Sequence, residues 1–477
     1  MCENCTRREF LGTTAMSGML LASSQAQAAG TSAGSRPAPR PAKATICTIF
    51  AGHPVPSDRS WGVCEEEIVL MEKSLKEVEK KLGNVKFVIG RASTPEQAAA
   101  LMQKAGDNAP VLAINLCISG LLRVSDPILK SGRPLAVFSA PASGHDWMYP
   151  FRWRQEGKPV TMFTSSDYGE LEHAARVLRV IPLMNNSRLL VFLPLRGTPA
   201  ACSAEQIKER FGTDVVMVPQ ERYDSLLESV DPEKAKAEAK AWIDDAKQIV
   251  EPTEKDVHQA ARVTIALQQL MEEEQAQGLA VGTCMGWLKR GFPCLGFTRL
   301  RDCGIPASCE GDMDSLLTMM LFNYMFDLPG FQGNATFDTA KNSVWTAHCV
   351  GPLKMDGPDG EAAPFLLRSH SEIGGGIVPE IQYRLGQEIT RTKLVNLDTL
   401  LISTGTIREV PDKSVRACRT QIVTEVGDAA KMVRNWGGGV LEGDMMTLLH
   451  RVVFYGNHMQ SAQHLADLMK MKVIEEA

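Results

Sequence analysis

The stretch that decides the fold reads ATICTIFA at 44–51, CEEEIVLMEKSLKEVEKKL at 64–82 and VKFVI at 85–89. The first and last segments are short and rich in β-branched residues, which is typical of buried strands. The middle segment carries Glu and Lys on one face, which indicates an amphipathic helix. A strand, a helix and a second strand in this order predict a mostly parallel sheet with helices on both faces, so the fold class is α/β.

The same alternation continues along the chain and predicts two α/β domains, at 44–185 and 186–330. Further short strands are expected in the first domain at 111–116 and 135–138. The second domain is expected to contain strands at 188–195 and 214–218, a helix at 203–211, and a long helical tract at 231–279 that is broken at Glu251-Pro252. Both domains are predicted to be doubly wound and Rossmann-like.

The hydrophobic period changes to two after Phe331, which predicts antiparallel strands. The segments concerned are 342–349, 376–381, 388–396 and 399–405, and an apolar helix is expected at 459–469. Residues 331–477 are therefore predicted to form an antiparallel, β-barrel-like C-terminal domain with a terminal helix.

The first residues look like a targeting segment. Thr6-Arg7-Arg8-Glu9-Phe10-Leu11-Gly12 precedes a short apolar stretch and then Ala26-Gln27-Ala28, which resembles a twin-arginine export signal with its cleavage site. We expect residues 1–28 to be this signal and residues 29–43 to be a disordered linker. The apolar stretch is too short to span a bilayer, so no membrane segment is expected after cleavage and the predicted location is periplasmic or secreted.

Composition narrows the classes of function. The 477 residues are 44% hydrophobic and 22% charged, which is typical of a soluble globular protein of two to three domains. The net charge is -5 and no basic stripe is present, so nucleic acid is not an expected partner. The sequence lacks GxGxxG and GxxxxGK[ST], the fingerprints of dinucleotide and P-loop nucleotide sites. Most of the cysteines lie in apolar contexts and are expected to be buried free thiols.

Three polar signatures in the C-terminal half carry the chemistry. They are Cys309-Glu310-Gly311-Asp312, Ala347-His348-Cys349, and the segment 450–458 that opens with His450. A carboxylate and two imidazoles beside strand ends or helix starts are suitable ligands for a divalent metal ion. A carboxylate at the start of a helix also commonly binds backbone amides, so a structural role for Glu310 stays open.

These motifs resemble those of the L-fucose isomerase and L-arabinose isomerase superfamily, closest to fucose-isomerase-like proteins. The resemblance rests on the segment 304–312, on Asn334 with Asp338 and Asn342 before His348-Cys349, and on His450 followed by Tyr455-Gly456. It implies a divalent metal, usually manganese, held between the central and C-terminal domains. It also implies a sugar substrate and a homo-oligomer.

By position in that family, Glu310 resembles the ligand that also acts as acid and base, and His348 and His450 resemble the ligand histidines. The family's active isomerases place a second acidic residue where this chain has Asn334, which we assign as the fourth ligand. An amide oxygen is a neutral and weaker ligand for a hard cation. Asp338 is the nearest acid and is predicted to be the second catalytic group.

Two further residues are expected to contact the substrate. His370 precedes the flexible Gly374-Gly375-Gly376, in a loop that either closes over a sugar or is an ordinary surface loop. Trp147 lies in Gly144-His145-Asp146-Trp147, where it either lines a substrate cleft or packs against the protein.

The resulting hypothesis is a metal-dependent aldose–ketose isomerase-like enzyme that acts on a deoxy-sugar or pentose. The reaction passes through an ene-diolate, and Glu310 moves the proton between the two carbons. Asn334 favours an alternative, an exported and catalytically silent sugar-binding protein on the same scaffold. Another metal-dependent carbohydrate reaction such as epimerisation is also open.

Overall fold

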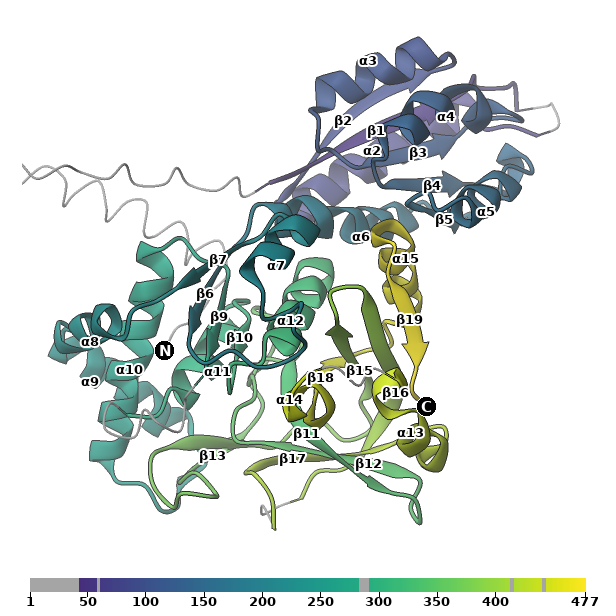
Figure 1. Cartoon of the computed structure of the whole chain (residues 1–477). Helices are drawn as coiled ribbons and strands as arrows, with labels where there is room; N and C mark the ends of the chain where they lie inside the picture. The colour runs from purple at the N-terminus through teal and green to yellow at the C-terminus, as the bar shows by residue number, and fades with distance from the viewer. Residues whose placement is uncertain (1–42, 58–60, 283–290, 412–415, 440–442) are drawn as a thin grey trace, which may run out of the picture.

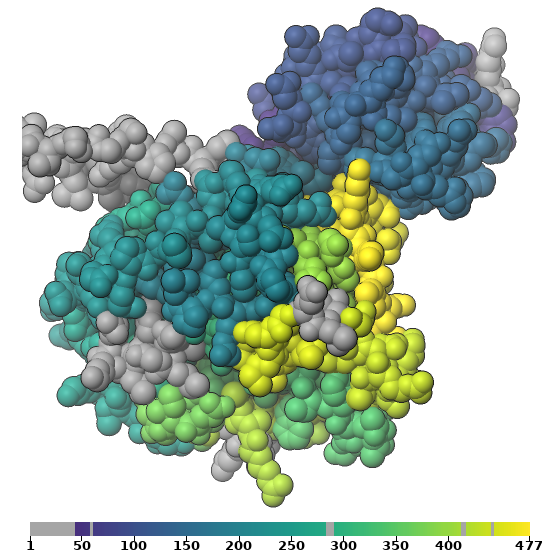
Figure 2. All heavy atoms as spheres, in the orientation of Figure 1, coloured from purple at the N-terminus to yellow at the C-terminus, as the bar shows by residue number. Residues whose placement is uncertain are grey.

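The computed structural model describes residues 43–57, 61–282, 291–411, 416–439 and 443–477. The predicted signal and nearly all of the predicted linker lie outside these residues. Figure 1 shows the first α/β unit, in purple and blue, projecting from a larger body formed by the rest of the chain, and Figure 2 shows the two parts in outline. Among the described residues, no helix combines the length and apolarity needed to cross a bilayer.

The first sheet is fully parallel, with the strand order β2-β1-β3-β4-β5. The prediction from residues 44–89 is confirmed, because these residues form a strand, a helix and a paired strand. The helix has Glu65 in its first turn, Lys81 in its last, and Gly83 in the left-handed conformation after it, all of which stabilise its ends. The elements are β1 Ala44–Ala51, α2 Glu65–Leu82, β2 Val85–Ala92, α3 Pro95–Ala105, β3 Val111–Asn115, α4 Gly120–Ser131, β4 Leu135–Ser139, α5 Met148–Gln155, β5 Val160–Thr164 and α6 Glu170–Asn185.

The central sheet is also parallel, with the order β10-β9-β6-β7. The helical tract expected at 231–279 is interrupted by the short strand β8, Gln248–Ile249, which pairs with β13, Phe365–Arg368. This correction reflects a tertiary pairing that local periodicity cannot reveal. The other elements are β6 Arg188–Phe192, α7 Ala204–Phe211, β7 Asp214–Met217, α8 Gln220–Glu228, α9 Pro232–Asp245, α10 Glu254–Glu273, β9 Gly278–Val281, α11 Cys294–Asp302, β10 Ala307–Ser308 and α12 Met313–Phe326.

The C-terminal region contains a closed antiparallel barrel with the order β15-β18-β11-β12-β17-β16, and the pairing of β15 with β16 closes it. The predicted mixed α/β class with a C-terminal barrel is therefore confirmed. β19 adds a parallel edge strand to β16, and β14 pairs with β13 outside the barrel. The elements are β11 Phe331–Asp338, β12 Ser343–His348, β14 Val378–Ile381, β15 Glu388–Val395, β16 Thr399–Glu409, β17 Thr420–Glu425, α13 Ala429–Asn435, α14 Met445–Leu449, β18 His450–Tyr455, α15 Met459–Met469 and β19 Lys472–Glu475.

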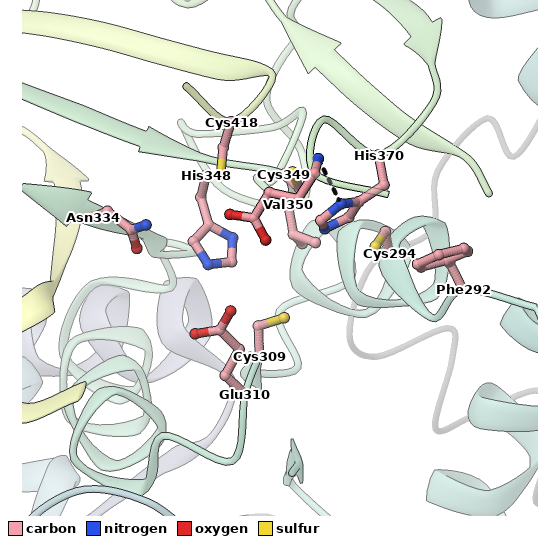
Figure 3. A pocket seen from close by; sticks show the side chains of 11 residues that line it. Phe292, Cys294, Cys309, Glu310, Asn334, His348, Cys349, Val350, His370 and Cys418 are labelled. Carbon is pink, nitrogen blue, oxygen red and sulfur yellow. Dashed lines mark hydrogen bonds between the residues drawn. The ribbon is translucent and has the colours of Figure 1, made fainter. Parts of the chain in front are cut away.

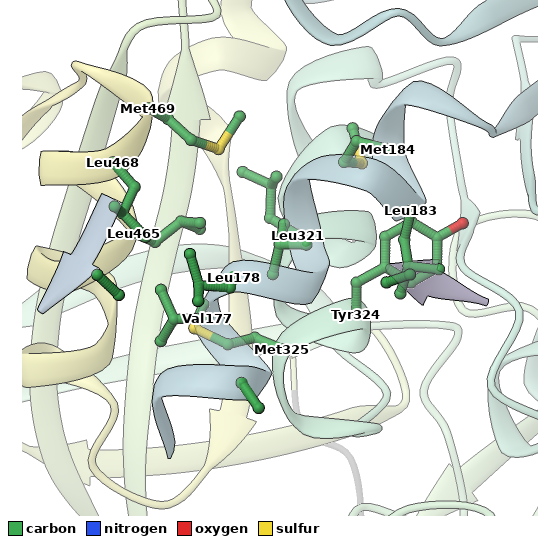
Figure 4. Close-up of a cluster of buried hydrophobic side chains, with 14 of the residues drawn as sticks. Val177, Leu178, Leu183, Met184, Leu321, Tyr324, Met325, Leu465, Leu468 and Met469 are labelled. Carbon is green, nitrogen blue, oxygen red and sulfur yellow. The ribbon is translucent and has the colours of Figure 1, made fainter. Parts of the chain in front are cut away.

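Three helices from distant parts of the chain share one apolar core. Figure 4 shows side chains of α6, α12 and α15 meeting, among them Leu178, Leu321 and Leu465. Helix α12 is apolar on nearly every side, and all of its residues from Met313 to Met325 are buried. Each large apolar side chain buried in this way contributes about 1.5–3 kcal/mol. The packing fixes α12, which begins just after Glu310, between the α/β part and the barrel.

The contact between α15 and the first sheet predicts a pH effect on stability. Nδ1 of His464 lies 2.7 Å from Oγ1 of Thr161, the His464 ring stacks on Phe163 at 4.1 Å, and burial lowers the pKa of His464 to about 4. The unfolded chain takes up this proton near pH 6.5, so the stabilisation present above that pH is lost as the pH falls towards 4. When the pH is lowered from 7 to 5, the free energy of unfolding should fall by about 1–2 kcal/mol less in His464→Gln than in the wild type.

Urea unfolding of both proteins at the two pH values measures this difference. His258→Gln on α10 is the matched control and should follow the wild type. Equal losses in the wild type and His464→Gln would show that His464 does not carry the effect.

Candidate metal site

Glu310 lies in a tight turn between β10 and α12. Its φ is +61° and that of Gly311 is +69°, so two successive residues are in the left-handed region. A Cβ on Gly311 would meet the carbonyl oxygen of Pro194 at 2.4 Å, which requires glycine there. The Gly311 amide donates to Val281 at 2.9 Å and its carbonyl accepts from Arg196 at 2.9 Å. The turn is thus held at the carboxyl ends of β9 and β6, where open parallel sheets bind ligands.

The barrel supplies the other side of the site. His348 is the last residue of β12, His450 is the first residue of β18, and Asn334 on β11 is paired with both strands. Figure 3 shows Glu310, His348 and Asn334 around one cavity. One ligand atom from each of Glu310, His348 and His450 lies within 4.8 Å of the other two, and Oε2 of Glu310 is 3.4 Å from Nε2 of His450. The predicted convergence of these three residues is therefore confirmed.

Three buried polar atoms around this point have no hydrogen-bond partner among the described residues: Nδ1 of His348, Nε2 of His450 and Oδ1 of Asn334. A buried acceptor without a partner costs about 1–3 kcal/mol, and this cost is removed when an ion occupies the space between such atoms. Together with the Glu310 carboxylate they form a mixed oxygen and nitrogen set, which suits divalent ions such as Mn²⁺ or Zn²⁺. The residues present therefore fit a divalent metal ion.

The orientation of His450 is set by Asp312. Nδ1 of His450 lies 2.9 Å from Oδ2 of Asp312 and 3.1 Å from Nε2 of Gln332. A carboxylate can only accept a hydrogen bond, and an amide nitrogen can only donate one. In Gln332, Nε2 donates to the carbonyl of Cys309 and Oε1 accepts from the amide of Cys309. The Nδ1 proton is therefore donated to Asp312, which leaves the Nε2 lone pair facing Glu310. Histidines that bind metals are commonly oriented by a carboxylate in this way.

A buried cation balances the charge of Asp312. Nζ of Lys393, on β15, lies 2.8 Å from Oδ2 of Asp312, and both side chains are fully buried. Burial alone would raise the pKa of Asp312, but Lys393 and His450 outweigh it and hold this pKa below its usual value. The neighbouring Asp314 accepts from the amide of Thr198 at 2.7 Å, yet burial and the charge of Asp312 raise its pKa to about 6. This network joins α12 to the barrel directly behind the site.

His348 is kept neutral by its surroundings. Burial is the main cause that lowers the pKa of His348 to about 3. A neutral imidazole has a free lone pair on one ring nitrogen at neutral pH, as a metal ligand requires.

Glu310, His348 and Asn334 line a small cavity of about 30 Å³. His370 is buried there and stacks on Phe292 at 5.6 Å, whereas residues 372–374 of the same loop are exposed. An adjoining open groove of about 1010 Å³ is lined in part by Asn334, Trp345 and Cys418. A small polar ligand in the cavity would therefore have a path to solvent.

Two predicted site residues lie away from the cluster. Asp338 ends β11, and its Oδ1 accepts from the amides of Ala340 and Lys341 at 3.1 Å in the following turn. At the rise of a strand it is about 13 Å from Asn334, so it does not supply a second acid to this site. Trp147 is 59% exposed at the start of α5 in the first α/β unit, and does not line the cavity. Neither Asp338 nor Trp147 therefore lies beside Glu310, His348 and His450 in this structure.

Sequence reasoning missed several residues that shape the site. Cys349 and Cys418 line the cavity, and Gln332 and Lys393 hold His450 and Asp312. The sequence carries a partial signal for Lys393, because Arg391 and Lys393 are charged residues inside a segment predicted to be a strand, and a charge buried in a strand needs a partner. The hydrogen bond from Cys418 lowers the pKa of the Cys349 thiol against the effect of burial.

Comparison with known proteins assigns the chain to no family. No protein-family model matches the sequence, and no curated protein matches it.

Proposed function

We propose that the protein is a divalent-metal-dependent aldose–ketose isomerase-like enzyme that acts on a deoxy-sugar or pentose. The observation that carries the proposal is the meeting of Glu310, His348 and His450 around buried ligand atoms without partners. The motifs that resemble the fucose and arabinose isomerases supply these three residues in the expected order. The same resemblance supports manganese as the metal, two doubly wound domains before the barrel, a homo-oligomer and a sugar as the partner molecule.

The side chains around the cavity suit a proton transfer between neighbouring carbons. An aldose and its ketose differ in the position of hydrogen at C1 and C2, and a bound divalent cation would share the negative charge of the ene-diolate between them. Glu310 can take the proton from one carbon and return it to the other, since its side chain is 30% exposed at the cavity. His450 is held by Asp312, which preserves the spacing between its Nε2 and the Glu310 carboxylate.

A second candidate is a catalytically silent sugar-binding protein on the same scaffold. Asn334 favours it, because a neutral amide stands where the resembling enzymes have an acid, and Asp338 does not replace it. The two candidates differ in turnover and in metal content. Metal analysis of the purified protein, followed by a screen of deoxy-sugars and pentoses for ketose formation, separates them. Bound metal with ketose formation supports the enzyme, whereas sugar binding without either supports the silent protein.

The role of Asn334 can be tested by restoring the charge. Asn334→Asp should strengthen Mn²⁺ binding by about 5- to 150-fold, or about 1–3 kcal/mol, because an anionic oxygen beside the ion adds Coulombic attraction in a buried place. Repulsion from Glu310 reduces the gain. Titration calorimetry with Mn²⁺ measures it.

Asn108→Asp adds the same charge at an exposed position in the first α/β unit and is the matched control. Its affinity for Mn²⁺ should equal that of the wild type. If Asn334→Asp also leaves the affinity unchanged, Asn334 is not a ligand.

A further inference from the structure

One arginine side chain crosses the interior of the barrel. Arg391 lies on β15 and is fully buried. Its Nη2 donates hydrogen bonds to the hydroxyl of Thr346 on β12, at 3.4 Å, and to the hydroxyl of Thr424 on β17. In the order of the barrel, β15 is next to β18 and β16 and is not a neighbour of β12 or β17. A side chain that joins β15 to these two strands must therefore reach across the interior.

The rest of this guanidinium group has no hydrogen-bond acceptor. Nε and Nη1 of Arg391 are buried without a partner among the described residues. Ser403 on β16 is directly opposite Arg391 in the register of the two strands, so the two side chains lie on the same face of the sheet. Ser403 is 1% exposed, and its Oγ has no partner either. Two nitrogen atoms and one hydroxyl, all able to donate, are thus left without an acceptor inside the barrel.

The positive charge of Arg391 is not balanced within the described part of the barrel. No carboxylate of the described residues forms an ion pair with it, because Glu476 binds Arg451 instead, at 2.7 and 2.9 Å. Burial lowers the pKa of Arg391 to about 10, and the charges of Glu476 and Arg451 act on it in opposite directions. The group is still charged at neutral pH. Since a buried and unpaired cation is strongly destabilising, a negative charge beside Arg391 would be favourable.

We infer that the barrel interior binds one small monovalent anion, such as chloride, between Arg391 and Ser403. The anion accepts hydrogen bonds from the guanidinium nitrogens and from the hydroxyl, and it balances the charge. A water molecule could also accept these hydrogen bonds, but it would leave the charge of Arg391 unbalanced. The donor atoms are out of contact with solvent, so a monatomic ion suits the place better than phosphate or sulfate. The inference needs neither the metal nor a sugar substrate, and it can fail independently of the proposed function.

The first test compares urea unfolding of the full chain in NaCl and in sodium methanesulfonate at the same ionic strength. EDTA keeps the protein free of metal, so that the ligands of the metal site do not contribute. An anion that binds only the folded protein raises the folding equilibrium constant in proportion to its concentration over its Kd. For a Kd on the order of 20 mM, about 200 mM chloride should raise this constant about tenfold above its value in methanesulfonate.

Three variants assign the effect to the two side chains. Arg391→Met removes the charge and should abolish the difference between the two salts. Ser403→Ala keeps the charge but removes one donor, so the affinity for chloride should fall several-fold. Ser343→Ala is the matched control, because Oγ of Ser343 on β12 also has no partner but lies on the face opposite to that of Thr346. Its response to chloride should equal that of the wild type. If Arg391→Met does not fold, the comparison of Ser403→Ala with Ser343→Ala decides.

A crystal of the full chain grown with NaBr locates the ion. Data measured near the bromine absorption edge should show an anomalous peak inside the barrel, within hydrogen-bonding reach of Arg391 and Ser403. Equal stability of the wild type in the two salts would overturn the inference. A barrel interior that contains water but no bromide would overturn it as well.

Discussion

Glu310→Gln is expected to abolish interconversion of aldose and ketose, with kcat falling on the order of 10²- to 10⁴-fold. The amide cannot accept the proton that must move between the two carbons, and it also replaces an anionic metal ligand by a neutral one. The backbone of residue 310 should be unaffected, because Gln has the same size and the left-handed turn is held by the hydrogen bonds of Gly311. Ketose formation under steady-state conditions measures the loss.

Asp338→Asn is the control for this prediction. It removes the acid that the sequence suggested as the second catalytic group, but the structure places that carboxylate in a turn after β11. Its kcat should stay close to that of the wild type. Equal losses of kcat in the two variants would mean that Glu310 has no special role. A Glu310→Gln variant with the kcat of the wild type would contradict the proposed proton transfer.

Lys393→Met is expected to destabilise the protein by about 3–5 kcal/mol. The substitution leaves the buried carboxylate of Asp312 without its cation, and the two side chains are fully buried at 2.8 Å from each other. Methionine fills a similar volume, so the cost arises mainly from the uncompensated charge rather than from a cavity. Equilibrium unfolding in urea measures the difference. Because Asp312 also orients His450, Mn²⁺ affinity should fall in the same variant.

A double-mutant cycle distinguishes the charge from the packing. Asp312→Asn keeps an oxygen that can cap α12 and removes the negative charge. Lys393→Met combined with Asp312→Asn should lose less stability than the sum of the two single variants. Lys76→Met, at an exposed position of α2, is the surface control and should change stability by no more than about 0.5 kcal/mol. Strict additivity in the cycle would contradict a direct interaction between the two groups.

The regular elements of the fold could be predicted from local patterns, and their pairings could not. Helix α2 was predictable from its amphipathic pattern, and β15 and β16 from their period of two. The pairing of β8 with β13 joins positions more than a hundred residues apart, so no local pattern predicts it. Closure of the barrel could not be predicted from local patterns either, because it depends on which distant strands become neighbours.

In the candidate site, too, the residues marked by local patterns could be predicted, whereas the contacts between distant segments could not. Glu310, His348 and His450 were predictable because a strand end or helix start marks each of them. Asp338 was chosen for its closeness to Asn334 in sequence, but four residues of extended strand carry it about 13 Å away. His370 was ambiguous because the sequence does not show that its ring packs on Phe292. The ion pair behind His450 joins β15 to α12 and could be found only in three dimensions.

The most direct test of the metal site is a crystal of the full chain grown with MnCl₂ and measured near the manganese absorption edge. The proposal predicts one anomalous peak among Glu310, His348 and His450, about 2.0–2.3 Å from a carboxylate oxygen, from Nδ1 of His348 and from Nε2 of His450. Asn334 should contribute its Oδ1 at a similar or longer distance. A crystal that binds manganese elsewhere, with no peak between these three side chains, would contradict the account.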